Sequence, residues 1–141
     1  MTYFYNRFNI NQINIMKLYD CSLYYDEDLI LNIRLNILNK YFDKFVICES
    51  KYSHSGRKKK LNFNINNFSD FKDKIIYVVS DQEPDDLIYK IKEGRKIESP
   101  EDYRYNSIKR IAFQRYTLMN TVNEIADAND FIFYSDNDEI P

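Results

Sequence analysis

The stretch FIFYSDNDEIP, residues Phe131 to Pro141, joins an apolar run to a cluster of carboxylates. Four residues of high β-propensity, Phe131 to Tyr134, predict a short strand. Asp136 and Asp138 follow directly, and alternate residues of an extended segment point to the same side. The sequence therefore predicts a strand that presents two carboxylates at its carboxyl end.

Further apolar runs upstream predict strands of the same kind. They are Lys17–Leu23, Lys44–Cys48 (KFVIC) and Lys74–Val79 (KIIYVV). The last two are nearly continuous in apolar residues, as expected of strands that are covered on both faces in a parallel sheet.

Amphipathic segments between these runs predict helices. Acidic residues at Asp26–Asp28 suit a helix N-terminus, where they meet the positive end of the helix dipole. An apolar face follows at spacings of three and four: Ile30, Ile33, Ile37 and Tyr41. A second helix is predicted over Tyr105–Ala126, with a stripe formed by Ile108, Ile111, Tyr116, Met119, Val122 and Ile125. The charged connection Ser80–Asp102 predicts a long loop with one helical turn.

Alternation of strands and helices predicts an α/β fold with a mostly parallel sheet and right-handed crossovers. In such sheets, ligands bind beyond the carboxyl ends of the strands. We expect one domain over residues 16–141 and a poorly ordered leader over residues 1–15, since the more regular pattern begins at Met16.

The composition of the chain argues against several classes of function. The formal net charge of −2 provides no general attraction for nucleic acid or an anionic membrane. Cys21 and Cys48 are too few for a disulfide framework or a zinc site and are predicted to be buried free thiols. No window is long and apolar enough for a transmembrane segment, and no signal-peptide pattern is present, so a soluble, cytoplasmic protein is expected.

Two carboxylates at a strand end suit a hard divalent cation such as Mn²⁺ or Mg²⁺, which could neutralise a diphosphate leaving group. Haloacid-dehalogenase-type phosphatases also place Asp-x-Asp after an apolar strand, but they continue with Gly-Thr, usually near the N-terminus. An EF-hand loop would require a glycine at its sixth position. Here Glu139-Ile140-Pro141 follows, so both alternatives fit poorly.

Taken in chain order, these motifs resemble glycosyltransferase family 17. The matching segments are Tyr19-Asp20-Cys21, Ile33-Arg34-Leu35, Val46–Ser50, the loop Ser55–Lys59, Lys74-Ile75-Ile76, Phe113-Gln114-Arg115 and Asp136–Pro141. Asn32 and Tyr116 depart from the family's usual residues, and the loop lacks its usual prolines. The resemblance covers residues 16–141 and is specific because the motifs occur together and in order.

The resemblance implies a GT-A-like fold and an inverting transfer from a UDP-sugar, UDP-GlcNAc above all, to a glycan acceptor. It assigns the metal to Asp138 and Asp136, with Asp136 nearer the ribose. The other nucleotide-sugar-binding candidates are Asp20, Glu49, Lys59 and Arg115. Alternatives stay open for several of these residues. Asp20 could be a buried partner of Arg34 or Arg115, and Arg115 could be a structural ion-pair partner. Arg57–Lys60 could form a solvated basic face, and His54 could be a surface residue.

Family domains extend well beyond the Asp-x-Asp motif. The resemblance therefore implies that the acceptor site and the general base lie outside this chain, which is expected to be a fragment. Besides an enzyme, the sequence is compatible with a catalytically incomplete nucleotide-sugar-binding module. A phosphohydrolase with Asp136 as nucleophile is disfavoured, because Gly-Thr does not follow the motif.

Overall fold

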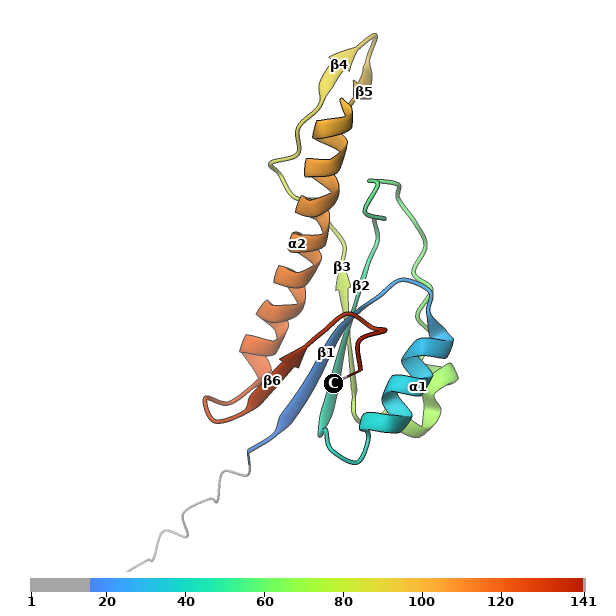
Figure 1. Ribbon diagram of the computed structural model, residues 1–141, viewed down its shortest axis with the longest axis vertical. Helices are drawn as coiled ribbons and strands as arrows, with labels where there is room; N and C mark the ends of the chain where they lie inside the picture. The colour runs from blue at the N-terminus through green and yellow to red at the C-terminus, as the bar shows by residue number, and fades with distance from the viewer. Residues whose placement is uncertain (1–15, 141) are drawn as a thin grey trace, which may run out of the picture.

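Four parallel strands form the centre of the fold in the computed structural model, which describes residues 16–140 (Figure 1). The leader predicted over residues 1–15, and Pro141, lie outside the described residues. The elements in chain order are β1 (Leu18–Tyr24), α1 (Asp28–Leu38), β2 (Lys44–Ser50), the 3₁₀ helix η1 (Ile65–Phe71), β3 (Ile75–Ser80), β4 (Lys90–Lys92), β5 (Arg95–Ile97), α2 (Pro100–Ile125) and β6 (Phe131–Tyr134).

The strand order in the sheet is β3-β2-β1-β6. Cys21 of β1 lies opposite Val46 of β2 on one side and Tyr134 of β6 on the other. The chain thus moves outward from β1 to β3 and then returns to place β6 on the far side of β1. This reversal creates a topological switch point between β1 and β6, the place where open α/β sheets bind ligands.

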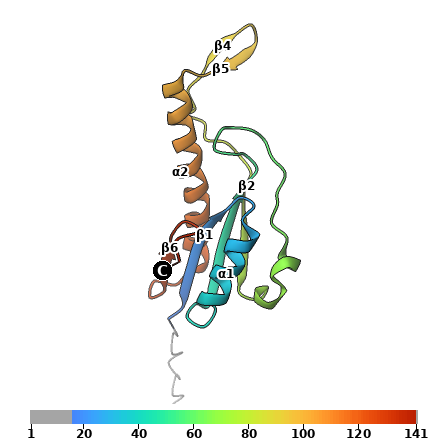
Figure 2. The ribbon, with the colours of Figure 1, turned by 45° about the vertical axis from the view of Figure 1, so that its right-hand side comes forward.

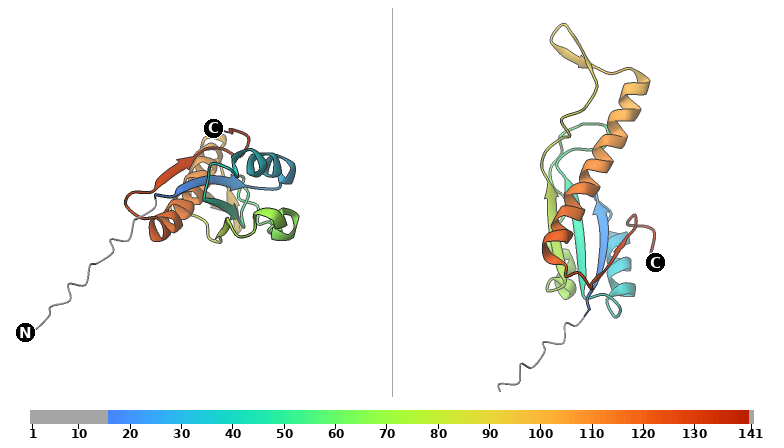
Figure 3. Two further views of the ribbon diagram at one scale, coloured as in Figure 1. Left: turned by 90° about the horizontal axis from the view of Figure 1, so that it is seen from below. Right: turned by 90° about the vertical axis from the view of Figure 1, so that its left-hand side faces the viewer.

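Helices cover the two faces of the sheet in separate layers, which confirms the predicted α/β class. α1 and η1 lie on one face, and α2 packs along the other against β2 and β3 (Figure 3). α2 runs antiparallel to the strands, and its N-terminal part extends past their carboxyl ends (Figure 2). The parallel strands and their connections match the pattern expected from the sequence.

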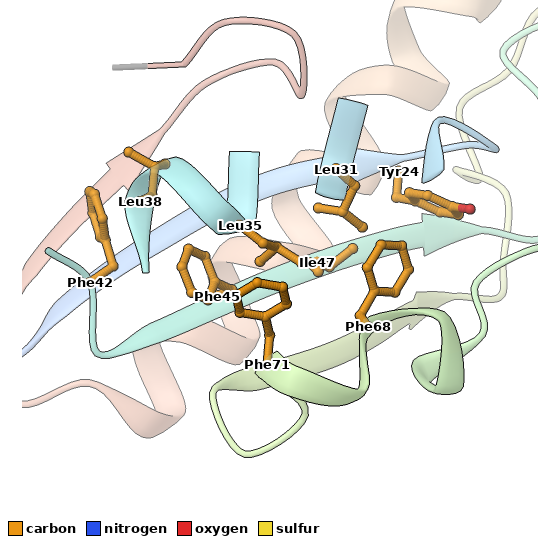
Figure 4. Close-up of a cluster of buried hydrophobic side chains, with 9 residues drawn as sticks. All are labelled: Tyr24, Leu31, Leu35, Leu38, Phe42, Phe45, Ile47, Phe68 and Phe71. Carbon is orange, nitrogen blue, oxygen red and sulfur yellow. The ribbon is translucent and has the colours of Figure 1, made fainter. Parts of the chain in front are cut away.

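The core between α1, η1 and the sheet is rich in aromatic and aliphatic side chains (Figure 4). Its members are Tyr24, Leu31, Leu35, Leu38, Phe42, Phe45, Ile47, Phe68 and Phe71. Burial of each large side chain contributes about 1.5–3 kcal/mol before entropic costs. A second cluster under α2 contains Cys21 and Cys48, which are buried free thiols as predicted, and burial raises the pKa of each to about 12.

The apolar face that the sequence indicates for α1 is not the face that meets the sheet. Ile33, Ile37 and Tyr41 are exposed, and Ile30 is half-buried. The face that meets the sheet consists instead of Leu31, Arg34, Leu35 and Leu38. The helix carries two apolar rows, and the buried one includes an arginine because Arg34 has an acidic partner on β1.

The connection between β3 and α2 was predicted as a long loop with one helical turn. It contains an antiparallel hairpin, β4–β5, in place of that turn. Its two-residue turn has positive φ at Glu93 (50°) and Gly94 (74°), as hairpin turns of the primed type require. α2 also begins five residues earlier than predicted, at Pro100, because Ser99 and Asp102 form a capping box. Of its predicted stripe, Val122 is buried, whereas Ile108, Tyr116 and Ile125 are exposed.

Candidate functional site

A pocket of about 470 Å³ opens at the carboxyl edge of the sheet, at the switch point between β1 and β6. Its walls come from the ends of β1 and β2, the start of α1, the middle of α2 and the turn after β6. The lining residues are Leu23, Tyr24, Tyr25, Glu27, Ile30, Ser50, Tyr52, His54, Lys59, Ile111, Gln114, Arg115, Asp136, Asn137 and Asp138. Four of the six predicted site residues therefore lie on one pocket: Lys59, Arg115, Asp136 and Asp138.

The two carboxylates of the Asp-x-Asp motif lie in a turn just beyond β6. The N–H of Glu139 donates to the carbonyl of Asp136 over 3.0 Å, which closes the turn. Asp136 and Asp138 are both exposed. Asp136 Oδ1 accepts a hydrogen bond from Arg115 Nη2 at 3.1 Å, an exposed pair in which both partners stay accessible to a ligand.

Arg34 holds this turn from beneath. Its buried guanidinium donates to the carbonyl oxygens of Asp136 and Glu139, at 3.0 Å each, and to that of Asn137 at 3.4 Å. It also donates to Ser135 Oγ at 2.7 Å. Three carbonyls converging on one cation fix the backbone that carries both carboxylates.

Asp20 faces Arg34 and not the pocket. Its two carboxylate oxygens accept hydrogen bonds from Arg34 Nε at 2.7 Å and Nη2 at 2.6 Å, and its side chain is 2% exposed. Of the partners that the sequence left open, Arg34 and Arg115, the structure has Arg34. Asp20 is therefore placed to act on the site through Arg34, since no part of it lines the pocket.

Glu49 is likewise fully buried beneath the pocket. Its carboxylate accepts hydrogen bonds from the backbone N–H groups of Asn62 and Phe63, at 2.8 and 3.0 Å, and from the Tyr77 hydroxyl at 2.7 Å. It also pairs with Lys59, whose ammonium lies 4.9 Å from the centre of the Tyr25 ring. Glu49 thus orients Lys59, which does line the pocket.

Gln114 and Arg115 bring α2 into the site. Gln114 is buried and donates to the carbonyl of Cys48 at 2.8 Å, which ties α2 to the end of β2. Arg115 lies over the Tyr134 ring, 5.3 Å from its centre, and reaches Asp136. These contacts place a cation beside the first carboxylate of the motif.

His54 and three tyrosines line the pocket although the sequence did not single them out as binding residues. His54 is exposed, as expected of a loop residue, but it faces Gln114, Arg115 and Asp136. Partial enclosure lowers the pKa of His54 from its ordinary value, against a hydrogen bond with Gln114 that raises it. Tyr24, Tyr25 and Tyr52 carried no sequence signal, because tyrosine is abundant throughout the chain.

The turn after β6 contributes two carboxylates to the pocket, Asp136 and Asp138, and a divalent cation would need further ligands. Across residues 16–140, no group of three or more His, Cys, Asp or Glu side chains is arranged to hold a metal. Mg²⁺, however, commonly uses one or two protein carboxylates and completes its shell with water and substrate phosphate oxygens. Between the two carboxylates, the buried Asn137 amide has no hydrogen-bond partner in the described chain, so the turn has unused polar capacity. The residues therefore fit a cation that arrives with a phosphate ligand.

The chain matches the family model described as Glycosyltransferase family 17 over residues 7–141. The chain belongs to this family. No curated protein and no solved structure matches it. Membership in family 17 supports a glycosyltransferase, an enzyme class that uses a sugar donor and a glycan acceptor. No helix of this family 17 chain is long and apolar enough to cross a membrane, as far as residues 16–140 are concerned.

Proposed function

We propose that the pocket binds a nucleoside diphosphate sugar, UDP-GlcNAc in particular, together with Mn²⁺ or Mg²⁺, for inverting transfer of the sugar to a glycan acceptor. The observation that carries this proposal is the position of Asp136 and Asp138. β6 presents both at the switch point of the sheet, in a pocket that also holds Arg115 and Lys59. The pocket thus combines carboxylates that could hold a metal ion with basic side chains that could bind a diphosphate.

Each pocket group has a proposed role. Asp138 and Asp136 would hold the cation, which would supply charge neutralisation of the diphosphate as it leaves. Arg115 and Lys59 would bind diphosphate oxygens, since each has N–H donors at the pocket wall. Arg34 and Glu49 keep these groups in position from below through the bonds described above. The donor sugar and the stereochemical outcome rest on family membership and are part of the proposal.

Binding of UDP-GlcNAc to the chain should require the metal, and calorimetry with and without Mn²⁺ tests this. Asp138→Ala should weaken metal-dependent binding at least about tenfold, which corresponds to roughly 1.4 kcal/mol. Asp127→Ala is the matched control, because Asp127 is an exposed carboxylate on the loop before β6, outside the pocket. Equal affinity without metal, or an unchanged affinity in Asp138→Ala, would contradict the proposal.

The alternative is a module that binds the donor without transferring the sugar. One observation favours it for this chain. The three carboxylates that line the pocket are Glu27, Asp136 and Asp138; two are assigned to the metal, and Glu27 accepts from the backbone N–H groups of Tyr25 and Asp26. An inverting enzyme also needs a base for the acceptor hydroxyl, so with these carboxylates engaged His54 is the remaining imidazole or carboxylate among the lining residues. Sugar transfer by the isolated chain to an acceptor glycan would rule the alternative out.

A further inference from the structure

A second hollow, of about 330 Å³, lies on the opposite side of α2, beside the carboxyl end of β3. It is lined by Asp81, Gln82, Phe113, Tyr116, Thr117, Asn120, Thr121 and Glu124. It shares no lining residue with the pocket at the switch point. The two sites are therefore separated by the body of the α2 helix.

The lining of this second hollow is built from two parallel rows of α2. Phe113, Thr117 and Thr121 follow one another at intervals of four residues, and so do Tyr116, Asn120 and Glu124. Residues four apart lie on the same face of a helix, one above the other. Together with Asp81 and Gln82, which follow β3, the two rows line a groove of roughly 16 Å along the helix axis, from the rise of 1.5 Å per residue.

The groove is lined by aromatic and polar side chains and carries no positively charged group. Its eight side chains comprise two aromatic rings, two carboxylates, two carboxamides and two hydroxyls, without any Lys, Arg or His. The carboxylates disfavour an anionic ligand, and Asp81 has a distant exposed partner in Lys51, at 3.9 Å. Aromatic faces accept the apolar C–H surface of a sugar ring, while carboxylates and carboxamides bind its hydroxyl groups.

Exposure makes these groups available to a ligand. Tyr116 is 63% exposed, although its position in the sequence suggested a core residue. Gln82, Asn120 and Glu124 are exposed as well. A shallow groove with an accessible ring and planar hydrogen-bonding groups suits an uncharged, polyhydroxylated chain better than an apolar ligand, which would need enclosure.

We propose that this groove is a second binding site, for an uncharged oligosaccharide, and that Tyr116 is its stacking platform. The proposal goes beyond the donor pocket and does not depend on it. In a glycosyltransferase, such a site would hold a part of a glycan remote from the reacting hydroxyl, where binding energy contributes to positioning.

Chemical-shift titration of the ¹⁵N-labelled chain tests the site without donor or metal. The probes are triacetylchitotriose, mannotriose and maltotriose. We expect saturable shifts of residues 81–82 and 113–124 with at least one of them. Tyr116→Ala should weaken that binding about tenfold, whereas Tyr103→Ala, an exposed tyrosine of α2 outside the groove, should leave it unchanged.

Asp138→Ala separates this proposal from the function of the donor pocket, because it should weaken metal-dependent donor binding and retain the oligosaccharide shifts. The proposal is overturned if none of the three probes gives saturable shifts at the groove, or if the shifts map to His54 and Asp136 instead. Equal binding by trigalacturonate, an anionic trisaccharide, or full binding by Tyr116→Ala would overturn it too. The amide spectrum of each variant verifies that it is folded.

Discussion

Arg34 joins three parts of the molecule that are far apart in the sequence: α1, β1 and the turn after β6. A guanidinium has five N–H donors in a rigid fork, and those of Arg34 reach two carboxylate oxygens, one hydroxyl and three carbonyls, with the two N–H groups of Nη1 shared among the three carbonyls. A buried charge is costly unless it is paired and hydrogen-bonded, and this one is both. Its pairing explains why an arginine occupies the core face of a helix.

Replacing Arg34 should therefore affect stability and the site separately. Arg34→Ala leaves Asp20 buried and unpaired, which should lower the free energy of unfolding by about 3–5 kcal/mol. Arg34→Lys keeps the charge but loses the fork, and should cost about 1–3 kcal/mol. Urea denaturation measures both, with the exposed Arg57→Ala as a control that should stay within about 0.5 kcal/mol.

The double variant Asp20→Leu/Arg34→Met distinguishes a general core role from support of the turn. Replacement of a buried ion pair by apolar residues is often neutral or stabilising, so the double variant should recover much of the stability lost in Arg34→Ala. Metal-dependent donor binding should not recover, because the carbonyls of Asp136, Asn137 and Glu139 still lack their donor. Recovery of both properties would show that Arg34 does not support the proposed metal site.

At the scale of elements, strand runs were predictable and helix faces were not. KFVIC and KIIYVV are apolar throughout, and length and β-branching distinguish such runs from helices. In α1, by contrast, Ile33 and Ile37 form one apolar row and Leu31 and Leu35 another. Periodicity cannot choose between two such rows. The choice depends on Arg34 and Asp20, a contact across fourteen residues that no local pattern reports.

In the candidate site, too, the positions of some residues could be predicted from the sequence and those of others could not. Asp136 and Asp138 were placed correctly at the sheet edge, because a strand followed by carboxylates is a local signal. The positions of Asp20 and Glu49 beneath the pocket depend on tertiary partners, Arg34 for one and backbone N–H groups for the other. His54 reaches the pocket because its loop folds back beside α2, which spacing alone does not reveal.

The β4–β5 hairpin is separate from the four-stranded sheet. Its strands pair only with each other among the described elements, and its residues are exposed. The chain is anchored before it, where the buried Asn106 exchanges hydrogen bonds of 2.8 and 2.7 Å with the backbone of Ile88. A two-stranded hairpin is marginally stable by itself.

Replacing residues 90–97 by two glycines should therefore change the free energy of unfolding by less than about 1 kcal/mol, since little buried surface is lost. Asn106→Ala should cost about 1–3 kcal/mol, because it removes the two part-buried hydrogen bonds between the Asn106 side chain and the backbone of Ile88. Urea denaturation compares the two variants. A loss of several kcal/mol in the hairpin variant would mean that β4 and β5 stabilise the body of the protein.

At the scale of the whole molecule, large apolar side chains remain exposed along β6 and, beside it, at Tyr41 after α1. β6 is an edge strand of the described sheet, and Phe131, Ile132 and Phe133 are 54, 37 and 42% exposed. On the α1 side, Phe133 meets Phe42 edge to face at 5.2 Å, next to the exposed Tyr41. The strand FIFY carries no charge, proline or bulge of the kind that protects natural sheet edges from pairing.

This chain should therefore self-associate through β6 as its concentration rises, and the average mass in sedimentation equilibrium should increase accordingly. Phe131→Lys places a charge on the edge strand at its most exposed position, where it opposes edge-to-edge pairing without opening the core. The variant should stay monomeric over the same range. Tyr103→Lys, a matched change on α2, should associate like the parent chain, because it lies away from the sheet edge. A parent chain that stays monomeric throughout, or association that Phe131→Lys leaves intact, would show that β6 does not drive it.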